Sequence, residues 1–466
     1  MRSFIHEDFL LESGTAHRLF HRYTSQLPVI DYHSHMDVKQ IAEDRHFESI
    51  TQLCLDGNQS RARLMRANGV DERYITGDAS DRDKFRRWAD IVPLTLRNPQ
   101  YHWTHMELQT AFGIGDVLNA DSADRIFDRC AELLEQPEFS VRGLIRKYNV
   151  QVLCTINDPI DSLQHHQNIQ RSGFECKVLP VWSPDRAVDL SDTEQFRRYV
   201  RQLAQVADAN IDTLDQLLDA LKKRHDYFAE CGCTIAKHNV ARFPWRPCGT
   251  SIARTIFTKA MAGHIISQEE QEQFQTVMLL ALARMNAARG WAQQIFFGTL
   301  HNACNRNGLS DSASRFDAIG NNTSAEALVA FLDNLEQTGE LAKTILFNIN
   351  PAENAMVAAI VENFQNGAEP GKMQYGAGWW YNATPEGMLS HLNAQSEHGL
   401  LSKFIGMFTD GTSFLSFSRH EYFRRVLCNL LGSDVERGLI PMQEIDRVSQ
   451  MVQDISYRNA KAYFGV

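Results

Sequence analysis

The chain lacks the features that would assign it to a membrane or to a nucleic acid. No run approaches about 18 consecutive apolar residues, so no transmembrane helix is expected. Basic residues are outnumbered, with a formal net charge of −10 and a pI near 5.9. This balance argues against binding to nucleic acid or to an anionic membrane surface. Repeats and low-complexity linkers are also missing from the 466 residues, which suit one large domain with an insertion, or two to three ordinary domains.

Paired cysteines and an export signal are missing as well. The nine cysteines are scattered, and Cys231 and Cys233 form a CxC without the second pair that a zinc site would need. The start, MRSFIHEDFLLESG, carries acids inside its apolar part and has no signal-peptide core. We therefore expect reduced, mostly buried thiols and a cytoplasmic protein.

The chain has enough apolar residues for a large core and a regular alternation of predicted strands and helices. Apolar residues make up 43% of it, and short apolar runs alternate with helical stretches. Continuous apolar runs suit parallel strands covered on both faces, and their alternation with helices predicts βαβ units. Eight units favour a closed (β/α)8 barrel; the open doubly wound sheet is the alternative, but no GxGxxG follows an early strand. The runs are 29–35, 150–158, 176–184, 233–240, 293–302, 344–350, 373–382 and 404–410.

Helix starts between these runs carry recognisable caps. A hydroxyl followed three residues later by an acid predicts a capping box, and a threonine before proline predicts a helix with proline at its first position. The expected starts are Ser191 with Glu194, Thr323 with Glu326, Ser418 with Glu421, and Thr384-Pro385.

The alternation of strands and helices is interrupted between the first and second apolar runs. This interval holds three helix-like stretches and predicts a helical insertion over residues 40–145. The barrel itself would then comprise residues 1–39 and 146–466. Insertions in the first βα loop sit over the mouth of a barrel, where functional sites lie.

The first run, VIDYHSHMD, ends in two histidines one residue apart. Because a strand points residues i and i+2 to the same face, His33 and His35 would stand side by side. In a closed barrel the eighth run lies next to the first, which brings Asp410 to the same place. Two imidazoles and a carboxylate would suit a divalent metal with open positions. The alternative is a polar strand end, with Asp410 capping the following turn.

Longer stretches carry a resemblance over almost the whole chain. They are EDFLL, HSH with QIAED, NGVDERYITGDASDRDKF, NPQYHWTHMEL, NDPIDSL, GKMQYGAGWWYN, and the run from FTD to SRHEYFRRVLCNLLG. The sequence resembles the uronate (glucuronate) isomerase family of the amidohydrolase superfamily.

The resemblance implies a distorted (β/α)8 barrel with a helical insertion. It implies isomerisation of D-glucuronate to D-fructuronate and of D-galacturonate to D-tagaturonate, in a homo-oligomer that binds a small sugar acid. His33, His35 and Asp410 match the family's ligands for a divalent metal, expected to be zinc. Asp410 also matches the family's catalytic proton carrier.

The sequence departs from the family pattern at predicted strand ends. Ser183 stands where the family has the arginine of WRPD, Lys237 replaces the aspartate of SDH, and Phe296 and His301 replace a histidine and an arginine. Ala383 and Thr412 replace an aspartate and an arginine. Lys237 and Arg61, the latter in a changed stretch of the insertion, are expected to bring new positive charge at or near the mouth. Arginine grips a carboxylate in bidentate fashion, so these losses indicate a changed substrate or lost activity around a retained metal site.

The residues expected to line the substrate pocket have plain structural alternatives. Lys237 would also suit a solvated loop, His301 a neutral hydrogen-bonding role, and the tryptophans the core. Phe296 is expected to fill the barrel interior. The residues assigned to substrate binding are Ser183, Lys237, His238, His301, Asn302, Trp379 and Trp380.

Three functions therefore remain open. The first is a uronate isomerase-like enzyme, and the second is a metal-dependent enzyme acting on a different sugar acid or derivative. The third is a catalytically inactive chain that binds a sugar acid.

Overall fold

The computed structural model describes residues 3–304, 317–321 and 324–466. Seven parallel strands form one curled sheet, in the order β1-β2-β3-β4-β5-β8-β9. They are β1 (Val29–Ser34), β2 (Val150–Asn157), β3 (Lys177–Trp182), β4 (Ile235–Val240), β5 (Ala292–Phe297), β8 (Thr344–Asn348) and β9 (Met373–Tyr375). β6 (Thr299–Leu300) and β7 (Ala318–Ile319) form a small antiparallel pair. The parallel order follows the chain, which agrees with the predicted barrel and excludes the doubly wound alternative.

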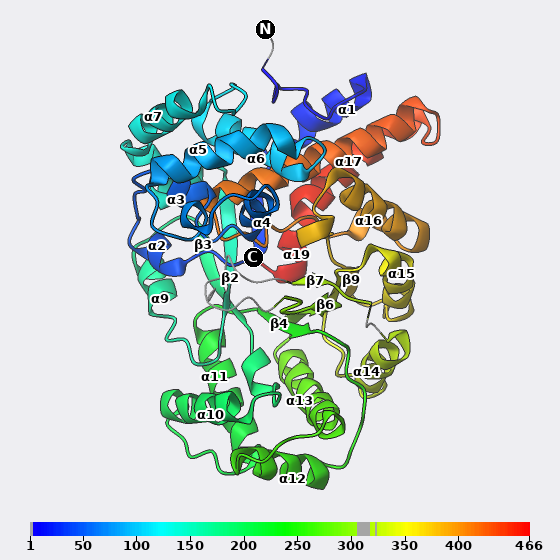
Figure 1. Ribbon diagram of the computed structural model, residues 1–466. Helices are drawn as coiled ribbons and strands as arrows, with labels where there is room; N and C mark the ends of the chain where they lie inside the picture. The colour runs from blue at the N-terminus through cyan, green and yellow to red at the C-terminus, as the bar shows by residue number, and fades with distance from the viewer. Residues whose placement is uncertain (1–2, 305–316, 322–323) are drawn as a thin grey trace.

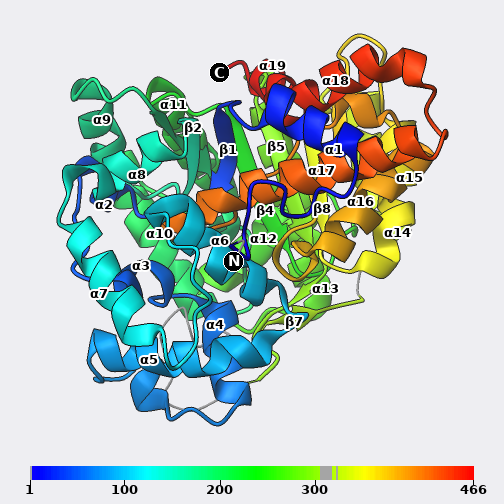
Figure 2. The same ribbon diagram turned by 90° about the horizontal axis from the view of Figure 1, so that it is seen from above.

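Helices surround the strands (Figure 2). The helices α1, α5, α6 and α7 lie at one end of the molecule together with α17, and α10 to α13 lie at the other end (Figure 1). The helices are α1 (Gly14–Leu19), α2 (Val38–Ala42), α3 (Ile50–Cys54), α4 (Gln59–Ala67), α5 (Asp81–Ile91), α6 (Pro99–Phe112), α7 (Ala123–Leu134), α8 (Val141–Lys147), α9 (Gln164–Arg171), α10 (Thr193–Ala207), α11 (Leu214–Glu230), α12 (Thr250–Met261), α13 (Gln268–Ala288), α14 (Ala325–Gln337), α15 (Asn354–Asn363), α16 (Pro385–His398), α17 (Ser418–Glu436), α18 (Ile445–Gln453) and α19 (Asn459–Phe464).

Alternate residues of the strands face two different cores. One apolar cluster collects a set of side chains from successive strands and forms the barrel interior: Tyr32, Val152, Val181, Ile235, Phe296 and Phe347. Their neighbours on the same strands pack outward against the helices, for example Trp182, Ala236, Ile295 and Leu346. Inside the barrel the rings of Phe296 and Phe347 stack with centroids 4.2 Å apart. This two-sided burial is what continuous apolar runs predict.

The eighth run differs from its prediction, because residues 404–410 form no strand. The segment still closes the barrel beside β1: Asp410 N–H donates to His33 O at 3.2 Å, and the Tyr32 hydroxyl donates to Gly406 O at 2.8 Å. A regular ladder is interrupted because Gly406 has φ +77°, and a Cβ there would lie 2.3 Å from Ile455 O. The seventh run is also shorter than predicted, since only Met373–Tyr375 is a strand.

The helices α2 to α8 lie between β1 and β2, where the insertion was predicted. Their apolar residues share a cluster with the outer side of β2, including Leu53, Trp88, Leu144 and Leu153. The division at residues 40 and 145 stays a prediction.

The predicted helix caps were only partly correct. Thr384 caps α16 with proline at the first position, as expected. α10 is capped by Asp192 in place of Ser191, and Ser418 lies inside α17 without acting as a cap. Ser324 caps α14, while Thr323 lies outside the described residues. Short polar side chains compete for the cap position, and the acid nearest to the free N–H groups occupies it at α10.

Candidate metal centre and barrel mouth

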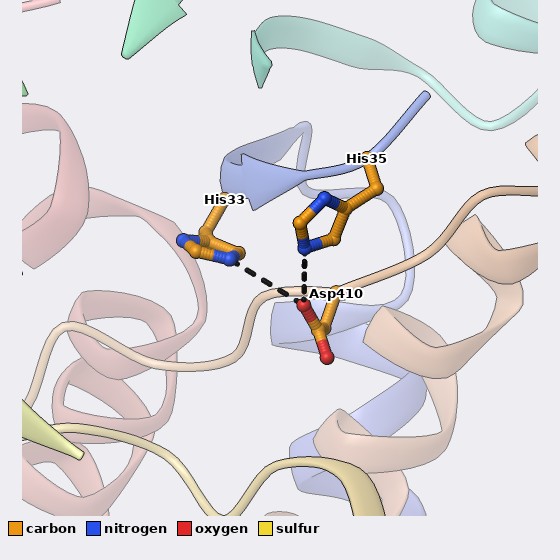
Figure 3. Close-up of side chains that lie close together, drawn as sticks. All are labelled: His33, His35 and Asp410. Atoms are coloured by element: carbon orange, nitrogen blue, oxygen red, sulfur yellow. Dashed lines mark ion pairs between the residues drawn. The ribbon is translucent and has the colours of Figure 1, made fainter. Parts of the chain in front are cut away.

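Three side chains converge at the carboxyl end of β1. His33 Nε2 lies 3.4 Å and His35 Nε2 lies 3.2 Å from the same atom, Asp410 Oδ1. Figure 3 shows both contacts meeting at one carboxylate oxygen. Within the described ranges, these residues are the one group of three or more His, Cys, Asp or Glu whose ligand atoms lie close enough to hold a metal ion, all within 4.8 Å of one another.

The orientation of His33 is fixed by a glutamine that the sequence did not single out. Gln294 Nε2 donates to Tyr32 O at 3.0 Å, and Gln294 Oε1 lies 2.7 Å from His33 Nδ1. Because a backbone carbonyl only accepts, the amide nitrogen must face Tyr32, and Oε1 must accept from His33 Nδ1–H. In its neutral form His33 therefore carries its lone pair on Nε2, facing Asp410, whereas the protonated form donates from Nε2 to Asp410. Burial lowers the pKa of His33 and favours this neutral form, although Asp410 opposes the shift.

Asp410 is held in place by its backbone. It adopts φ +49°, its N–H donates to His33 O, and the N–H of His35 donates to Gly411 O at 2.9 Å. Burial alone would raise the pKa of Asp410, but the two histidines facing it outweigh burial and hold the pKa well below its usual range. The side chain of His35 is 46% exposed, so the group opens toward solvent.

Lys237 and Ser183 are held together by Asp185, an acid that the sequence analysis did not single out. Lys237 Nζ donates to Asp185 Oδ2 at 2.7 Å, and the Ser183 hydroxyl donates to the same oxygen at 3.4 Å. Asn239 N–H donates to Asp185 Oδ1 at 3.1 Å. Lys237 is only 9% exposed. It is therefore the buried partner of an ion pair, and the solvated loop alternative does not apply.

His301 and Asn302 belong to a second polar group around Asp317. His301 Nδ1 lies 3.3 Å from Asp317 Oδ2, and Asn302 N–H donates to Asp317 Oδ1 at 2.9 Å. The backbone carbonyl of Asp317 accepts from Arg63 at 3.0 Å and from the Tyr381 hydroxyl at 2.7 Å. The two predicted residues thus share one carboxylate.

His238 does not join this group, because it points to the helix layer. Its Nε2 lies 3.5 Å from Asn286 Nδ2 on α13, and Asn286 Oδ1 lies 3.2 Å from His225 Nε2 on α11. Burial lowers the pKa of His238 to about 4, which describes a neutral core histidine. Since Lys237 faces the barrel, strand alternation sends His238 the other way.

The aromatic residues form a wall beside His33. The ring of Phe296 lies 4.6 Å from that of His33 and 4.9 Å from that of Trp379, with Trp380 stacked 5.6 Å beyond Trp379. Phe296 and Trp379 are buried, whereas Trp380 is half-buried. Phe296 therefore fills the interior as predicted, and Trp380 is the tryptophan with the larger exposed part.

Three other changed positions differ in their surroundings. Arg61 was expected to add positive charge at the mouth, but it is buried and bound to Glu107 at 2.6 Å, so this expectation was wrong. Ala383 is buried, and Thr412 is exposed next to Gly411.

All nine cysteines are free thiols, and most of them are buried, as expected. In the part of the chain that the structure describes, no helix combines the length and apolar character needed to cross a bilayer.

Comparison with known proteins gives one consistent result. The family model for glucuronate isomerase matches residues 1–464. A uronate isomerase of Phocaeicola vulgatus is 47% identical, with the full length of both chains covered. The solved structure of a uronate isomerase from Thermotoga maritima superposes with a TM-score of 0.92 at 33% identity and covers 99% of each chain. A glucuronate isomerase structure from Caulobacter crescentus gives 0.89 at 25% identity, covering 99% of this chain and 97% of the other.

Proposed function

The chain belongs to the glucuronate isomerase family, and on that basis we propose that it is an aldose–ketose isomerase of sugar acids. The expected reactions convert D-glucuronate to D-fructuronate and D-galacturonate to D-tagaturonate. The convergence of His33, His35 and Asp410 at the mouth of the amidohydrolase-type barrel is the observation that carries this proposal.

The three residues fit a divalent metal ion, which we propose to be zinc. In neutral His33, Nε2 is the acceptor because Nδ1–H is committed to Gln294, and it faces a carboxylate oxygen that is also an acceptor. Two facing acceptors need a cation or a proton between them. Nitrogen and oxygen ligands suit zinc, and three protein ligands leave room for substrate. A bound divalent ion would polarise substrate oxygens and make the C2 proton more acidic.

Asp410 is the residue to which we assign the proton transfer. The isomerisation moves one proton from C2 to C1 and another from the C2 hydroxyl to the carbonyl oxygen, through an enediol and without net change of atoms. Asp410 Oδ1 faces both histidines, which leaves Oδ2 to take the C2 proton and return it to C1. The depressed pKa of Asp410 keeps its carboxylate in the ionised form that a base requires.

The test is a turnover assay of the zinc-loaded full chain with both uronates, with the Asp410→Asn variant as comparison. We expect ketouronate from the natural chain and at least about a thousandfold less from the variant, as for loss of a general base and ligand together. Absence of ketouronate with the natural chain at high enzyme concentration would rule the proposal out.

A second candidate is an enzyme for another sugar acid, or an inactive chain that binds one. Two observations support it. Lys237 is engaged by Asp185, and no arginine occupies positions 183, 301 and 412 to hold a uronate carboxylate. A panel of aldonates, lactones and phosphorylated sugars separates these functions from the first. The cytoplasmic location and the homo-oligomer stay predictions, and sedimentation of the purified chain would test the latter.

A further inference from the structure

A cavity of about 420 Å³ with both polar and apolar walls opens beyond the carboxyl end of β4. It lies between the residues after β4, the short turn that carries Asp185, and the first half of α13. This volume suits a small ligand. The cavity is close to the barrel interior, since Asp185 in its wall binds Lys237, and Lys237 pairs in register with Gln294, the residue that holds His33.

The lining suits a ligand with many hydroxyl groups. Carboxylates and amides of Asp189, Glu272 and Gln275 offer planar donors and acceptors, and His301 adds a ring nitrogen. Asn239 also lines the cavity, and among the described residues its buried Oδ1 has no hydrogen-bond partner. A buried acceptor without a partner is costly, so a hydroxyl donor in the cavity would be favourable there.

Most cations around the mouth are already engaged. Lys237 binds Asp185, Arg61 binds Glu107, and His301 pairs with Asp317. Arg63 and Arg419 donate to backbone carbonyls and lie over aromatic rings.

Arg242 is the exception on the cavity wall. It is exposed, and its guanidinium makes no ion pair or side-chain hydrogen bond with any described residue. The acids nearby have partners of their own. Asp185 is neutralised by Lys237 and Glu272 lies 3.4 Å from Arg246, whereas Asp189 accepts, among the described residues, only a backbone N–H from Ser191 and keeps its charge.

We propose that this cavity is the sugar-acid subsite and that Arg242 binds the carboxylate of the ligand, with Asn239 and the neighbouring acids taking its hydroxyls. The assignment rests on the proposed function for the ligand class and replaces Lys237 as the anion-binding group. A guanidinium can bind a carboxylate through two parallel hydrogen bonds, which an ion-paired lysine cannot provide.

Calorimetric titration of the zinc-loaded full chain tests the proposal without requiring turnover. The ligands are D-glucuronate and D-galacturonate, with D-glucose and D-galactose as uncharged counterparts. We expect Arg242→Gln to weaken binding of both uronates by roughly tenfold to a hundredfold, the range of a charge-assisted hydrogen bond, and to leave the neutral sugars unchanged. Arg254→Gln is the matched control, since Arg254 is an exposed arginine on α12 that pairs with Asp215.

The contrary outcomes are equally clear. Equal uronate affinity in the natural chain and Arg242→Gln, or no uronate binding by the natural chain, would overturn the assignment. So would a loss of the preference for uronates in Lys237→Gln but not in Arg242→Gln, because the carboxylate would then lie inside the barrel. Arg242-dependent binding without ketouronate would instead leave the subsite standing and remove the proposed isomerase activity.

Discussion

Two histidine–aspartate pairs at the mouth have similar distances and exposure but differ in the other groups that contact the carboxylate. His35 lies 3.2 Å from Asp410, and His301 lies 3.3 Å from Asp317, with histidine side chains 46% and 41% exposed. The carboxylate of Asp317 receives a backbone N–H from Asn302 on its other oxygen. Asp410 Oδ1 instead faces a second histidine, His33, whose Nε2 is an acceptor in the neutral form.

The difference shows which group needs a partner from outside the chain. The Asp317 pair is satisfied by donors of the protein itself, as is the Lys237–Asp185 pair beside it. The Asp410 group directs two imidazole nitrogens at one carboxylate oxygen, an arrangement that suits a cation bound between them. A close histidine–carboxylate distance is therefore weak evidence for a metal site, whereas the direction of the hydrogen bonds around it is strong evidence.

The largest expected effect separates these two pairs directly. His35→Ala should lower zinc affinity by at least about 100-fold, because loss of a partner that merely supports a ligand already costs 10- to 100-fold. His301→Ala, with similar exposure and the same kind of partner, should keep its metal. Elemental analysis after dialysis against a chelator series measures both. His35 is the better test than His33, which is 1% exposed and packed against Phe296. Equal zinc content in the two variants would contradict the ligand assignment.

A smaller effect is expected at Gln294, which holds the tautomer of His33. Gln294→Leu should weaken zinc binding by about 10- to 100-fold, while Gln294→Glu should restore it, since a carboxylate also accepts from Nδ1–H. Gln293→Leu is the matched control, because Gln293 is equally buried on the same strand but donates outward to Thr344. Zinc affinity by competition with a chromophoric chelator would show the difference. A loss of the same size in both leucine variants would indicate general damage to β5 in place of positioning.

The convergence of His33, His35 and Asp410 could be predicted from the sequence because it depends on rules that are local or topological. Residues i and i+2 of a strand share a face, and a closed barrel places its last segment beside its first. These two rules bring His33, His35 and Asp410 together even though residues 404–410 lack the regular strand pairing. The strand itself could not be excluded in advance, because the sequence does not reveal that Gly406 adopts φ +77° against the backbone of Ile455.

The residues on the β4 side of the mouth were harder to predict, and one of the errors could have been avoided. Lys237 and His238 are neighbours on β4, so both could not face the barrel, and alternation alone would have removed one of them. Asp185 had a weak signal, two residues beyond Ser183 at a strand end. Asp317 had none, because Asn302 is 15 residues away in the sequence and no local or topological rule brings the two together.

The smallest effect concerns the Lys237–Asp185 pair, which we regard as complete without a ligand. Lys237→Met should lower the free energy of unfolding by about 1–3 kcal/mol, because it leaves Asp185 partly buried without its cation. Asp185→Asn should have a similar effect through Lys237. The double variant should recover part of the loss, since neither charge is then left alone. Urea unfolding of the four chains yields the coupling energy, with Arg254→Gln as an exposed-pair control expected to cost less than about 1 kcal/mol. Strictly additive losses would mean that the two charges do not stabilise one another, and Lys237 would again be free to bind a ligand.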